Sequence, residues 1–508
     1  MIAVSDAWKA IHRESILPES HIELTYRITE PGAQALATES NNGATFYSDH
    51  TAIVDTTDKV HPKYATLEHN LWKLDGSFAI LPENELYGDT GYVADVSNAE
   101  ITISFPTVRE YIVPGVTIVW SETYGEYATR CRVTARNGVE TVATKEFENN
   151  SIRSTFELPI SGYDSITLEV LEWCIPEHRP RIERFYLGAI EVYTDSSLVN
   201  YTHEQSADIL STSLPKNEIS FSLDNSSGVW NPENPVGNVR YLIDRQEVAV
   251  RYGYKLPTGI EWIKGGTFWV SGWETPTNGL EATFTARDLL EFMDAIYAGP
   301  KAGTLYEVVM AALTQANLPT TETGTPRYYV DEVLKTINTD FTNDDSSYSI
   351  AVILQMCANA GQCIMRQTRE GILRIERYAR QLSDYEVKED ISYTHPEFTL
   401  SKPPKVITIN DGLWVENIAP VGEEVTVNNP LISTQENAEH VSHWVAAVLR
   451  CRKIVKGTFR PDPRLDALDV VSVESKYSTG LTSAVTDISY SYNGAFQGTY
   501  TGREIEVG

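Results

Sequence analysis

The sequence predicts a mainly β fold with a minor α+β part, arranged as antiparallel barrels or sandwiches. Apolar and polar side chains alternate through residues 21–29, 217–225 and 247–254, and this period of two is typical of half-buried antiparallel strands. Near the C-terminus, Asn493 and Gly494 separate two alternating stretches. We expect a two-residue hairpin turn of type I′ there, because both positions tolerate positive φ angles.

Helices are expected in only three places, and each has a recognisable signal. Residues 304–316 carry apolar side chains along one stripe, residues 347–360 end before Gly361, and residues 434–452 begin at a capping Thr434. Apolar residues three or four positions apart give each segment one buried face. Because these helices are few and short, they are predicted to form a small α+β part beside the strands.

Composition and charge limit the classes of function. The chain has 508 residues, of which 42% are hydrophobic and 22% charged. This is an ordinary globular composition, and at roughly 150 residues per domain it suggests about three to four domains. The net charge of −29 argues against binding a nucleic-acid backbone as a main activity. The five cysteines include no CxxC motif, as expected for folding in a reducing cytoplasm, and we expect neither a signal peptide nor a transmembrane segment.

The sequence lacks the common catalytic motifs. It contains no GxSxG, GxxxxGKS/T, HExxH or GxGxxG pattern. His440 and His443 are three residues apart on the third expected helix, and Asp340, Asp344 and Asp345 form an acidic cluster. Neither set has the full complement of ligands that zinc or calcium requires, so a solvated helix face and a solvated loop are the favoured interpretations. We therefore expect no catalytic residue, no metal site and no cofactor.

Aromatic residues are frequent between residues 64 and 190, where turn signals recur about every 8–12 residues, as in a jelly roll or sandwich. Sugars bind to flat aromatic faces beside planar hydrogen-bonding groups, because pyranose rings have an apolar face and a rim of hydroxyls. This chemistry predicts a glycan-binding module; the alternative is that most of these aromatic side chains only pack strands together. The candidate glycan-binding residues are Trp72, Asp75, Tyr87, Tyr92, Tyr124, Tyr127, Trp173 and Arg179.

Two stretches of the sequence carry a family resemblance. The first, within residues 213–293, includes SLPKNEISFSLDNSSGVWNPENP, and the second, within residues 420–505, includes GTFRPDPRLDALDVVSVESKY and ISYSYNGAFQGTYTGRE. Their order resembles the tail-hub family of bacteriophages and prophages of Gram-positive bacteria, which includes central baseplate hubs and tail-associated proteins. The resemblance covers residues 1–35 and 195–508. In the second stretch, DALDVV predicts a strand that enters a barrel wall at about Leu468.

The resemblance implies a division of the chain into parts. Proteins of the hub family hold two antiparallel barrels side by side. The region between the first strand and the rest of barrel 1 departs from a minimal hub and looks like a discoidin-like or carbohydrate-binding-like jelly roll inserted at an exposed loop. The expected parts are the first strands of barrel 1 (1–35), the inserted module (36–194), the rest of barrel 1 (195–295), an α+β middle domain (296–396) and barrel 2 (397–508).

The function that the resemblance implies is structural and not enzymatic. A homotrimer would form a ring at the tail tip or baseplate of the virion, where it closes or continues the tail tube, and the inserted module would bind host cell-wall polysaccharide. The expected partners are a distal tail protein, the tail tube, a tape-measure protein and other baseplate or fibre proteins. DNA would pass through the channel without specific binding, and the chain would be made in the bacterial host cytoplasm. The alternatives are a glycan-active enzyme with an accessory binding module and a hexameric distal-tail ring protein.

Overall fold

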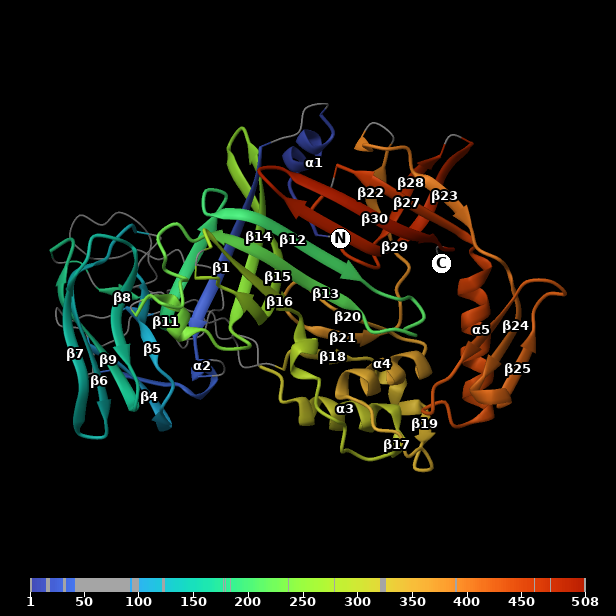
Figure 1. The fold of residues 1–508 in the computed structure, drawn as a ribbon, viewed down its shortest axis with the longest axis horizontal. Helices are drawn as coiled ribbons and strands as arrows, with labels where there is room; N and C mark the ends of the chain where they lie inside the picture. Colours follow the sequence, from blue (N-terminus) through green and yellow to red (C-terminus); the bar gives the residue numbers. More distant parts are fainter. Residues whose placement is uncertain are drawn as a thin grey trace, which may run out of the picture.

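Strands dominate the structure and helices are few, which confirms the predicted mainly β class. Figure 1 shows one long sheet crossing the molecule, with a strand sandwich at one end and the longer helices gathered along the lower side and at the other end. The computed structural model describes residues 2–14, 19–30, 33–41, 92–93, 100–120, 124–176, 178, 180–182, 184–235, 237–277, 279–319, 326–388, 391–460, 462–475 and 477–506.

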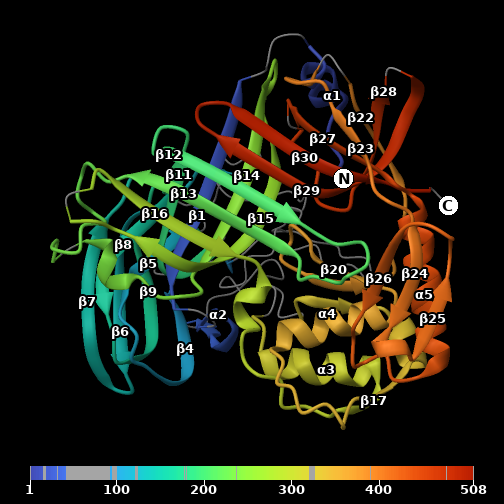
Figure 2. The ribbon, with the colours of Figure 1, turned by 45° about the vertical axis from the view of Figure 1, so that its right-hand side comes forward.

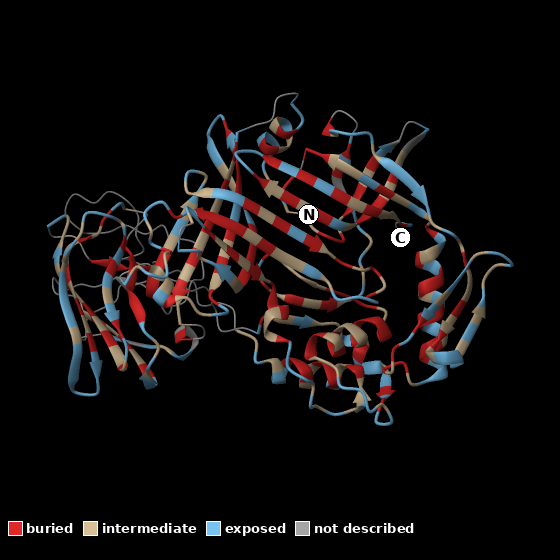
Figure 3. Cartoon of the chain, in the orientation of Figure 1, coloured by how far each residue is buried: buried red, intermediate tan, exposed pale blue. Residues whose placement is uncertain are grey.

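The first part of the long sheet curls round a core of its own, and we call it the N-terminal β-unit. Burial alternates along its strands, so that Ile22, Leu24 and Tyr26 point into the core and their neighbours point away (Figure 3). Inside, the ring of Tyr26 stacks on Trp230, which meets Phe284 edge-on. In sheet order the unit consists of β12 (Leu198–Ser206), β13 (Lys216–Asp224), β16 (Glu281–Arg287), β15 (Gly259–Glu274), β14 (Glu247–Leu256), β1 (Ser20–Thr29) and β11 (Arg184–Thr194).

The second part of the sheet, the C-terminal β-unit, continues directly from the first. Strand β12 pairs with β13 on one side and with β29 on the other, from Tyr201 opposite Tyr492 to Ser206 opposite Asp487. The two units therefore share one hydrogen-bonded sheet, although each has a separate core. The strands are β29 (Ser478–Tyr492), β30 (Phe496–Glu504), β27 (Lys453–Phe459) and β23 (Glu397–Leu400), with β28 (Val470–Ser475) and β22 (Leu382–Val387) beyond β29.

A short N-terminal helix, α1 (Asp6–His12), lies across the junction of the two units (Figure 2). Its Trp8 is fully buried against Tyr254 of the N-terminal β-unit, with ring centroids 4.6 Å apart. At the other end of the helix, Arg460 of the C-terminal β-unit donates a hydrogen bond to the carbonyl oxygen of His12. The helix is thus anchored on both units and fixes them relative to each other.

The described strands between β2 and β11 form a β-sandwich with its own core, packed between two layers of strands. One layer is a five-stranded sheet, and the other consists of strands that continue from β11. The crossing point is Gly188, where β11 leaves the sandwich and begins to pair with β1; a Cβ atom there would lie 2.3 Å from the carbonyl oxygen of Ile28. The five-stranded layer is β2 (Thr38–Asn41), β4 (Glu100–Arg109), β9 (Tyr163–Trp173), β6 (Ala128–Asn137) and β7 (Glu140–Glu148); the other holds β5 (Val113–Val119) and β8 (Arg153–Ile160), and β3 (Tyr92–Val93) pairs with β10 (Arg181–Ile182).

All three predicted helices are present and begin at side-chain caps. Thr304 caps α3 (Leu305–Ala316) in a capping box, Ser349 caps α4 (Ile350–Ala360), and Thr434 caps α5 (Gln435–Arg450). Their apolar faces share one core with two small sheets. One small sheet is β18 (Tyr328–Val330), β21 (Leu373–Glu376) and β20 (Ile364–Gln367), the other is β25 (Trp414–Asn417), β24 (Pro404–Ile409) and β26 (Glu423–Val427), and β17 (Ala302–Thr304) pairs with β19 (Asn338–Asp340) nearby; the shortest helix is α2 (Ala33–Leu36).

Two local predictions are wrong in detail. The hairpin between β29 and β30 is present, but Tyr492 pairs with Phe496, so the turn has three residues and only Gly494 takes a positive φ, of 79°. A two-residue type I′ turn is therefore excluded. Leu468 lies in a turn before β28 with a φ of 72°, instead of inside a strand, and its side chain is buried. The strand therefore begins at Val470, two residues later than the sequence indicated.

Candidate functional site

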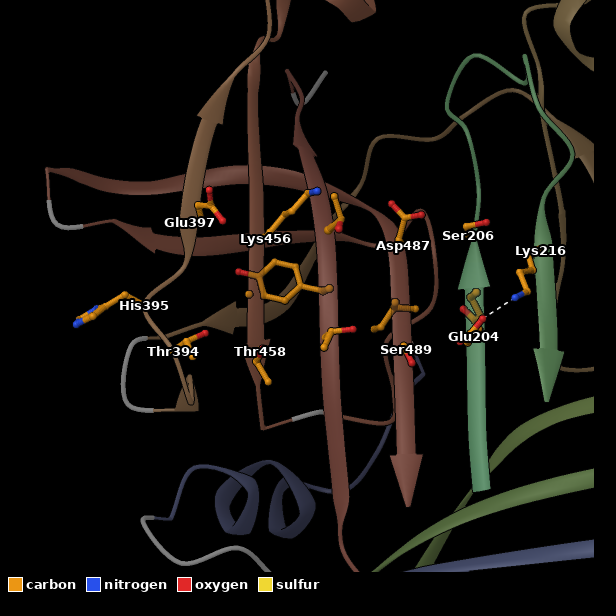
Figure 4. Close-up of a pocket in the computed structure, with 16 residues that line it drawn as sticks. Glu204, Ser206, Lys216, Thr394, His395, Glu397, Lys456, Thr458, Asp487 and Ser489 are labelled. Atoms are coloured by element: carbon orange, nitrogen blue, oxygen red, sulfur yellow. Dashed lines mark hydrogen bonds and ion pairs between the residues drawn. The ribbon is translucent and has the colours of Figure 1, made fainter. Parts of the chain in front are cut away.

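A depression lies where the two β-units join. It is a shallow groove of about 620 Å³ on the outer face of the shared sheet, and it crosses β27, β30, β29, β12 and β13 (Figure 4). Side chains that alternate away from the two cores line it, so its chemistry follows from the strand period. The polar lining consists of Glu204, Ser206, Lys216, Thr394, His395, Glu397, Lys456, Thr458, Asp487, Ser489, Thr499 and Thr501.

The groove offers hydroxyl groups and dispersed charges. Glu204 and Lys216 form an ion pair of 2.5 Å across β12 and β13, and their hydrogen bond raises the pKa of Lys216. Both side chains are about half exposed, so this pair contributes little to stability. Carboxylates and lysines are mixed along the groove, and no block of cations is available to hold a phosphate backbone. The arrangement suits a polar surface that touches its neighbours weakly.

A buried polar network lies beneath the groove, on the inner face of β12. His203 is fully buried; its Nδ1 accepts from the Tyr252 hydroxyl at 2.8 Å, and its Nε2 donates to the Asn217 side chain at 2.8 Å. Tyr201 lies 2.6 Å from the same Tyr252 hydroxyl. Burial lowers the pKa of His203 to about 4, so the ring is neutral at pH 7. The hydrogen bonds of this network depend on one another, because the proton that one member donates fixes which group the next member can accept from.

An arginine joins three parts of the molecule beside this network. Arg369, in the turn between β20 and β21, donates from Nε to both oxygens of Asp466 at 2.9 Å. Its Nη1 donates to the carbonyl oxygen of Lys264 in β15 at 2.7 Å, and its Nη2 to that of Leu465 at 3.0 Å. Gln205 of β12 donates to the same carboxylate at 3.0 Å. The helical part and the two β-units are therefore fixed at one buried guanidinium.

A second polar cluster lies at one end of the sandwich, where several of the glycan-binding candidates meet. Its centre is Glu126, which is only 1% exposed. The carboxylate accepts from Trp173 Nε1 at 2.9 Å and lies 2.8 Å from His178 Nδ1, while Arg181 Nη1 is 3.9 Å away. Tyr124 lies under the Arg181 guanidinium, 4.7 Å from ring centroid to carbon. Aromatic rings and a planar carboxylate therefore occur together at this end of the sandwich, but the carboxylate is buried and already paired within the protein.

The structure describes four of the eight predicted glycan-binding residues, and only some of them lie together. Tyr124 and Trp173 belong to the Glu126 cluster, and Tyr127 packs beside it against the sandwich core. Tyr92 lies on β3, opposite Ile182 of β10. Glu126, His178 and Arg181 were not predicted as partners. Glu126 lies about 50 residues before the other two, and the three form no sequence motif. The remaining candidates, which are Trp72, Asp75, Tyr87 and Arg179, lie outside the described residues.

The two candidate metal clusters have ordinary structural partners. His443 is 56% exposed on α5, and its Nε2 lies 3.7 Å from Glu416. In the acidic cluster, Asp340 accepts from Thr342 and Asp344 accepts from Ser346, which are contacts of a tight turn. Across the part of the chain that the structure describes, no group of three or more His, Cys, Asp or Glu side chains is placed to hold a metal ion.

Comparison with known proteins finds matches among solved structures. No protein-family model and no curated protein matches the chain. Among solved structures, a 43 kDa tail protein of prophage MuSo2 from Shewanella oneidensis aligns with a TM-score of 0.43 at 11% identity, covering 61% of this chain and 95% of that one. A tail protein from Neisseria meningitidis aligns with 0.44 at 10% identity, covering 62% and 94%, and a prophage tail protein from Listeria monocytogenes with 0.38 at 10%, covering 63% and 93%.

These three similarities are too low to assign a function, because each TM-score is below 0.5 and each identity is near one tenth. No helix in the described ranges is both long and apolar enough to cross a membrane.

Proposed function

We propose that the chain is a structural, non-catalytic hub protein of a phage or prophage tail, located at the tail tip or baseplate. The observation that carries the proposal is the pairing of β12 with β29, which makes two β-units into one continuous sheet. One chain thereby supplies two adjacent segments of a curved wall. Three chains supply six segments, which match a sixfold tail tube on one side and a threefold tip on the other. The hub motifs of the sequence fall within these two units.

The groove face suits the wall of a channel for DNA. Serine and threonine hydroxyls alternate with separate charges over both β-units, and the whole chain carries a net charge of −29. A polyanion is held by arrays of unpaired Lys and Arg, which this face lacks among the described groove residues. DNA can therefore move along the face without binding to it. A distal tail protein, the tail tube, a tape-measure protein and other baseplate or fibre proteins are the proposed partners at the ends of the ring.

The purified chain is expected to form a trimeric ring. Light scattering and single-particle imaging at micromolar concentration will report a mass of three chains and a threefold particle with a central channel and three peripheral lobes. This geometry is possible because the two β-units lie side by side in one continuous sheet. A compact monomer at concentrations well above micromolar would contradict the hub proposal and favour a free binding protein or an enzyme. A sixfold ring would contradict the trimer and favour a distal-tail ring protein.

We assign the sandwich, within the proposed insert 36–194, to binding of host cell-wall polysaccharide through the surface around the Glu126 cluster. Its attachment supports a fixed orientation. Strand β11 belongs to both the sandwich and the N-terminal β-unit, and Arg109 forms a bidentate ion pair with Glu30 at the junction. The Tyr111 hydroxyl also donates to the carbonyl oxygen of Tyr241. A module held in this way presents one face outward from the ring.

Replacing residues 31–187 by a short Gly/Ser bridge is expected to abolish adsorption to host cells and leave ring assembly unchanged. Thr29 and Gly188 are direct partners in the β1–β11 ladder, so a short hairpin can join the strands there without moving them. The measurement is sedimentation of the labelled protein with host cell walls, beside the mass of the oligomer. The matched control is the intact chain with Arg136→Gln, a change of an exposed side chain near the other end of β6 from the cluster.

Each outcome of the replacement has a separate meaning. If the shortened chain assembles and still binds cell walls, the sandwich is not the receptor-binding part. If it binds no walls and also fails to assemble, the sandwich is needed for the ring, and the division of labour between insert and hub is wrong. Release of reducing sugar by the intact chain would contradict the non-catalytic assignment.

A further inference from the structure

A half-exposed arginine face lies on this otherwise acidic chain. Residues 364–380 hold five arginines and two glutamates; Arg369 is buried in its ion pair with Asp466, which leaves a net charge of +2 against −29 for the whole chain. On the small sheet β18–β21–β20, Tyr329, Arg374 and Arg366 are aligned in register across the three strands. We define these three residues as the arginine face. Its position on one sheet surface makes it a flat patch and not a scattered set of charges.

The arginine face has the chemistry of a protein interface. Both guanidinium groups bind the one carboxylate of Glu376, at 3.2 Å from Arg366 and 2.7 Å from Arg374, so one positive charge is left over. The Arg374 guanidinium lies 4.5 Å over the ring of Tyr329, and that tyrosine is 45% exposed. Arginine and tyrosine are enriched at the centres of protein interfaces, where a rigid planar cation and an amphipathic ring lose little entropy. The face therefore fits an acidic protein surface.

An acidic face of matching character lies on the N-terminal β-unit. Asp224, Glu274 and Glu281 are all exposed and meet at one end of β13, β15 and β16, where Asp224 pairs directly with Glu281. Beside them Leu280 is 73% exposed. We define the three carboxylates as the acidic face. An apolar centre with a charged surround is the common composition of a protein interface.

The two faces cannot meet within one chain. The Gln367 side chain of β20 accepts from the Leu289 amide, which places the arginine face near the C-terminal end of β16. The acidic face lies at the opposite end of the same strand, which at seven residues spans roughly 20 Å. A contact between them must therefore join two chains. Since the two patches differ, the contact is head-to-tail, and a head-to-tail contact gives a ring when the rotation between copies closes and an open filament when it does not.

We propose that the arginine face of one chain docks on the acidic face of the next copy and that this contact closes the ring. The inference rests on the proposed hub function and names the surface through which its subunits meet. Charge complementarity guides the encounter, Tyr329 and Leu280 fill the centre, and the threefold repeat satisfies every copy of both faces. The net charge of −29 on each chain otherwise opposes association, so the contact is sensitive to salt.

Charge exchange tests the contact. Arg366→Glu with Arg374→Glu is expected to weaken assembly at least about 100-fold, and Glu274→Arg with Glu281→Arg to weaken it similarly, because like charges then face each other. Combining all four changes in one chain restores complementarity, and assembly returns to within about 10-fold of wild type. The readout is oligomer mass against concentration by sedimentation velocity. The matched control is Arg130→Glu with Arg136→Glu, two exposed arginines on the sandwich.

The outcomes separate this inference from the hub proposal. A wild-type ring that both reversed variants still form overturns the docking contact and leaves the hub. Loss of assembly in each variant without recovery in the combined one shows that the two faces do not meet, and overturns the contact as well. A wild-type chain that never associates overturns the hub and the second-copy partner together. If charge reversal prevents folding, Arg366→Gln with Arg374→Gln is used in its place. An assembly constant equal to that of the wild type would then contradict the inference.

Discussion

Arg369→Met is expected to lower the free energy of unfolding by about 3–5 kcal/mol. It removes the cation of a buried ion pair, and the remaining carboxylate then has no opposite charge beside it. The guanidinium is almost completely buried and makes four hydrogen bonds, two to the Asp466 carboxylate and two to the carbonyl oxygens of Lys264 and Leu465. Methionine preserves most of the volume and none of the donors. The Leu465 carbonyl oxygen still accepts from the Tyr490 hydroxyl, so the cost falls chiefly on the Asp466 carboxylate.

The measurement is urea unfolding, with ring assembly recorded beside it. Arg369 contacts the N-terminal β-unit and the loop before β28 from a turn of the helical part, so its loss is expected to loosen the ring as well as the chain. Arg130→Met is the control, since that arginine is 51% exposed and lies 3.9 Å from Glu172; its effect should stay below about 1 kcal/mol. Adding Asp466→Leu to Arg369→Met should recover part of the loss by removing the unpaired charge. An unchanged unfolding midpoint in the single variant would contradict the junction.

The secondary structure could be predicted because its signals are local. Apolar residues alternate along β1 and β13, and Thr304 and Thr434 cap their helices through contacts within three residues. The strand partners could not be predicted in this way. Alternation fixes which side chains point inward along β12, but it does not say that β29, far along the chain, is its neighbour. Two turns differed for the same reason, since only the paired strands decide where a turn begins.

The candidate site was predictable by composition and not by geometry. Tyr124 and Trp173 were selected as aromatic residues in a strand-rich module, and the structure places both near one carboxylate. That carboxylate, Glu126, is one of 70 acidic residues, and its burial depends on folding of the strands around it. In the sequence, nothing distinguishes Arg369 from the neighbouring Arg366 and Arg374, which are only partly buried. Charge alone does not separate a buried junction from a solvated patch.

Two buried groups give the chain opposite responses to acid. Burial lowers the pKa of His203 to about 4, so below its ordinary value of 6.5 the unfolded chain binds a proton that the folded chain refuses. Stability is lost as the pH falls from 6.5 to about 4, by about 3 kcal/mol in all. Burial raises the pKa of Asp288 from 3.8 to about 7, so here the folded chain holds the extra proton. Stability is gained as the pH falls from 7 toward 3.8, by about 4 kcal/mol.

The two effects nearly cancel in the wild-type chain, and each single variant should reveal the other. Relative to wild type, His203→Gln should become more stable as the pH falls below 6.5, apart from a constant loss of packing. Asp288→Asn keeps the capping bond to the Leu290 amide, and it should be more stable than wild type at pH 8 and equal to it near pH 4. The measurement is urea unfolding at steps of pH between 4 and 8. His443→Gln, at an exposed histidine, is the control and should not change the slope.

The double variant decides whether the two groups act independently. Both touch Asn217, whose side chain accepts from His203 and whose carbonyl oxygen accepts from the Asp288 amide. If they are independent, the double variant has a flat difference profile equal to the sum of the single ones. If protonation of one changes the pKa of the other through Asn217, the sum fails by more than about 0.5 kcal/mol. If the stability of both single variants changes with pH in the same way as that of the wild type, neither group is buried as the structure has it. That result would contradict the hydrogen-bond network beneath the groove.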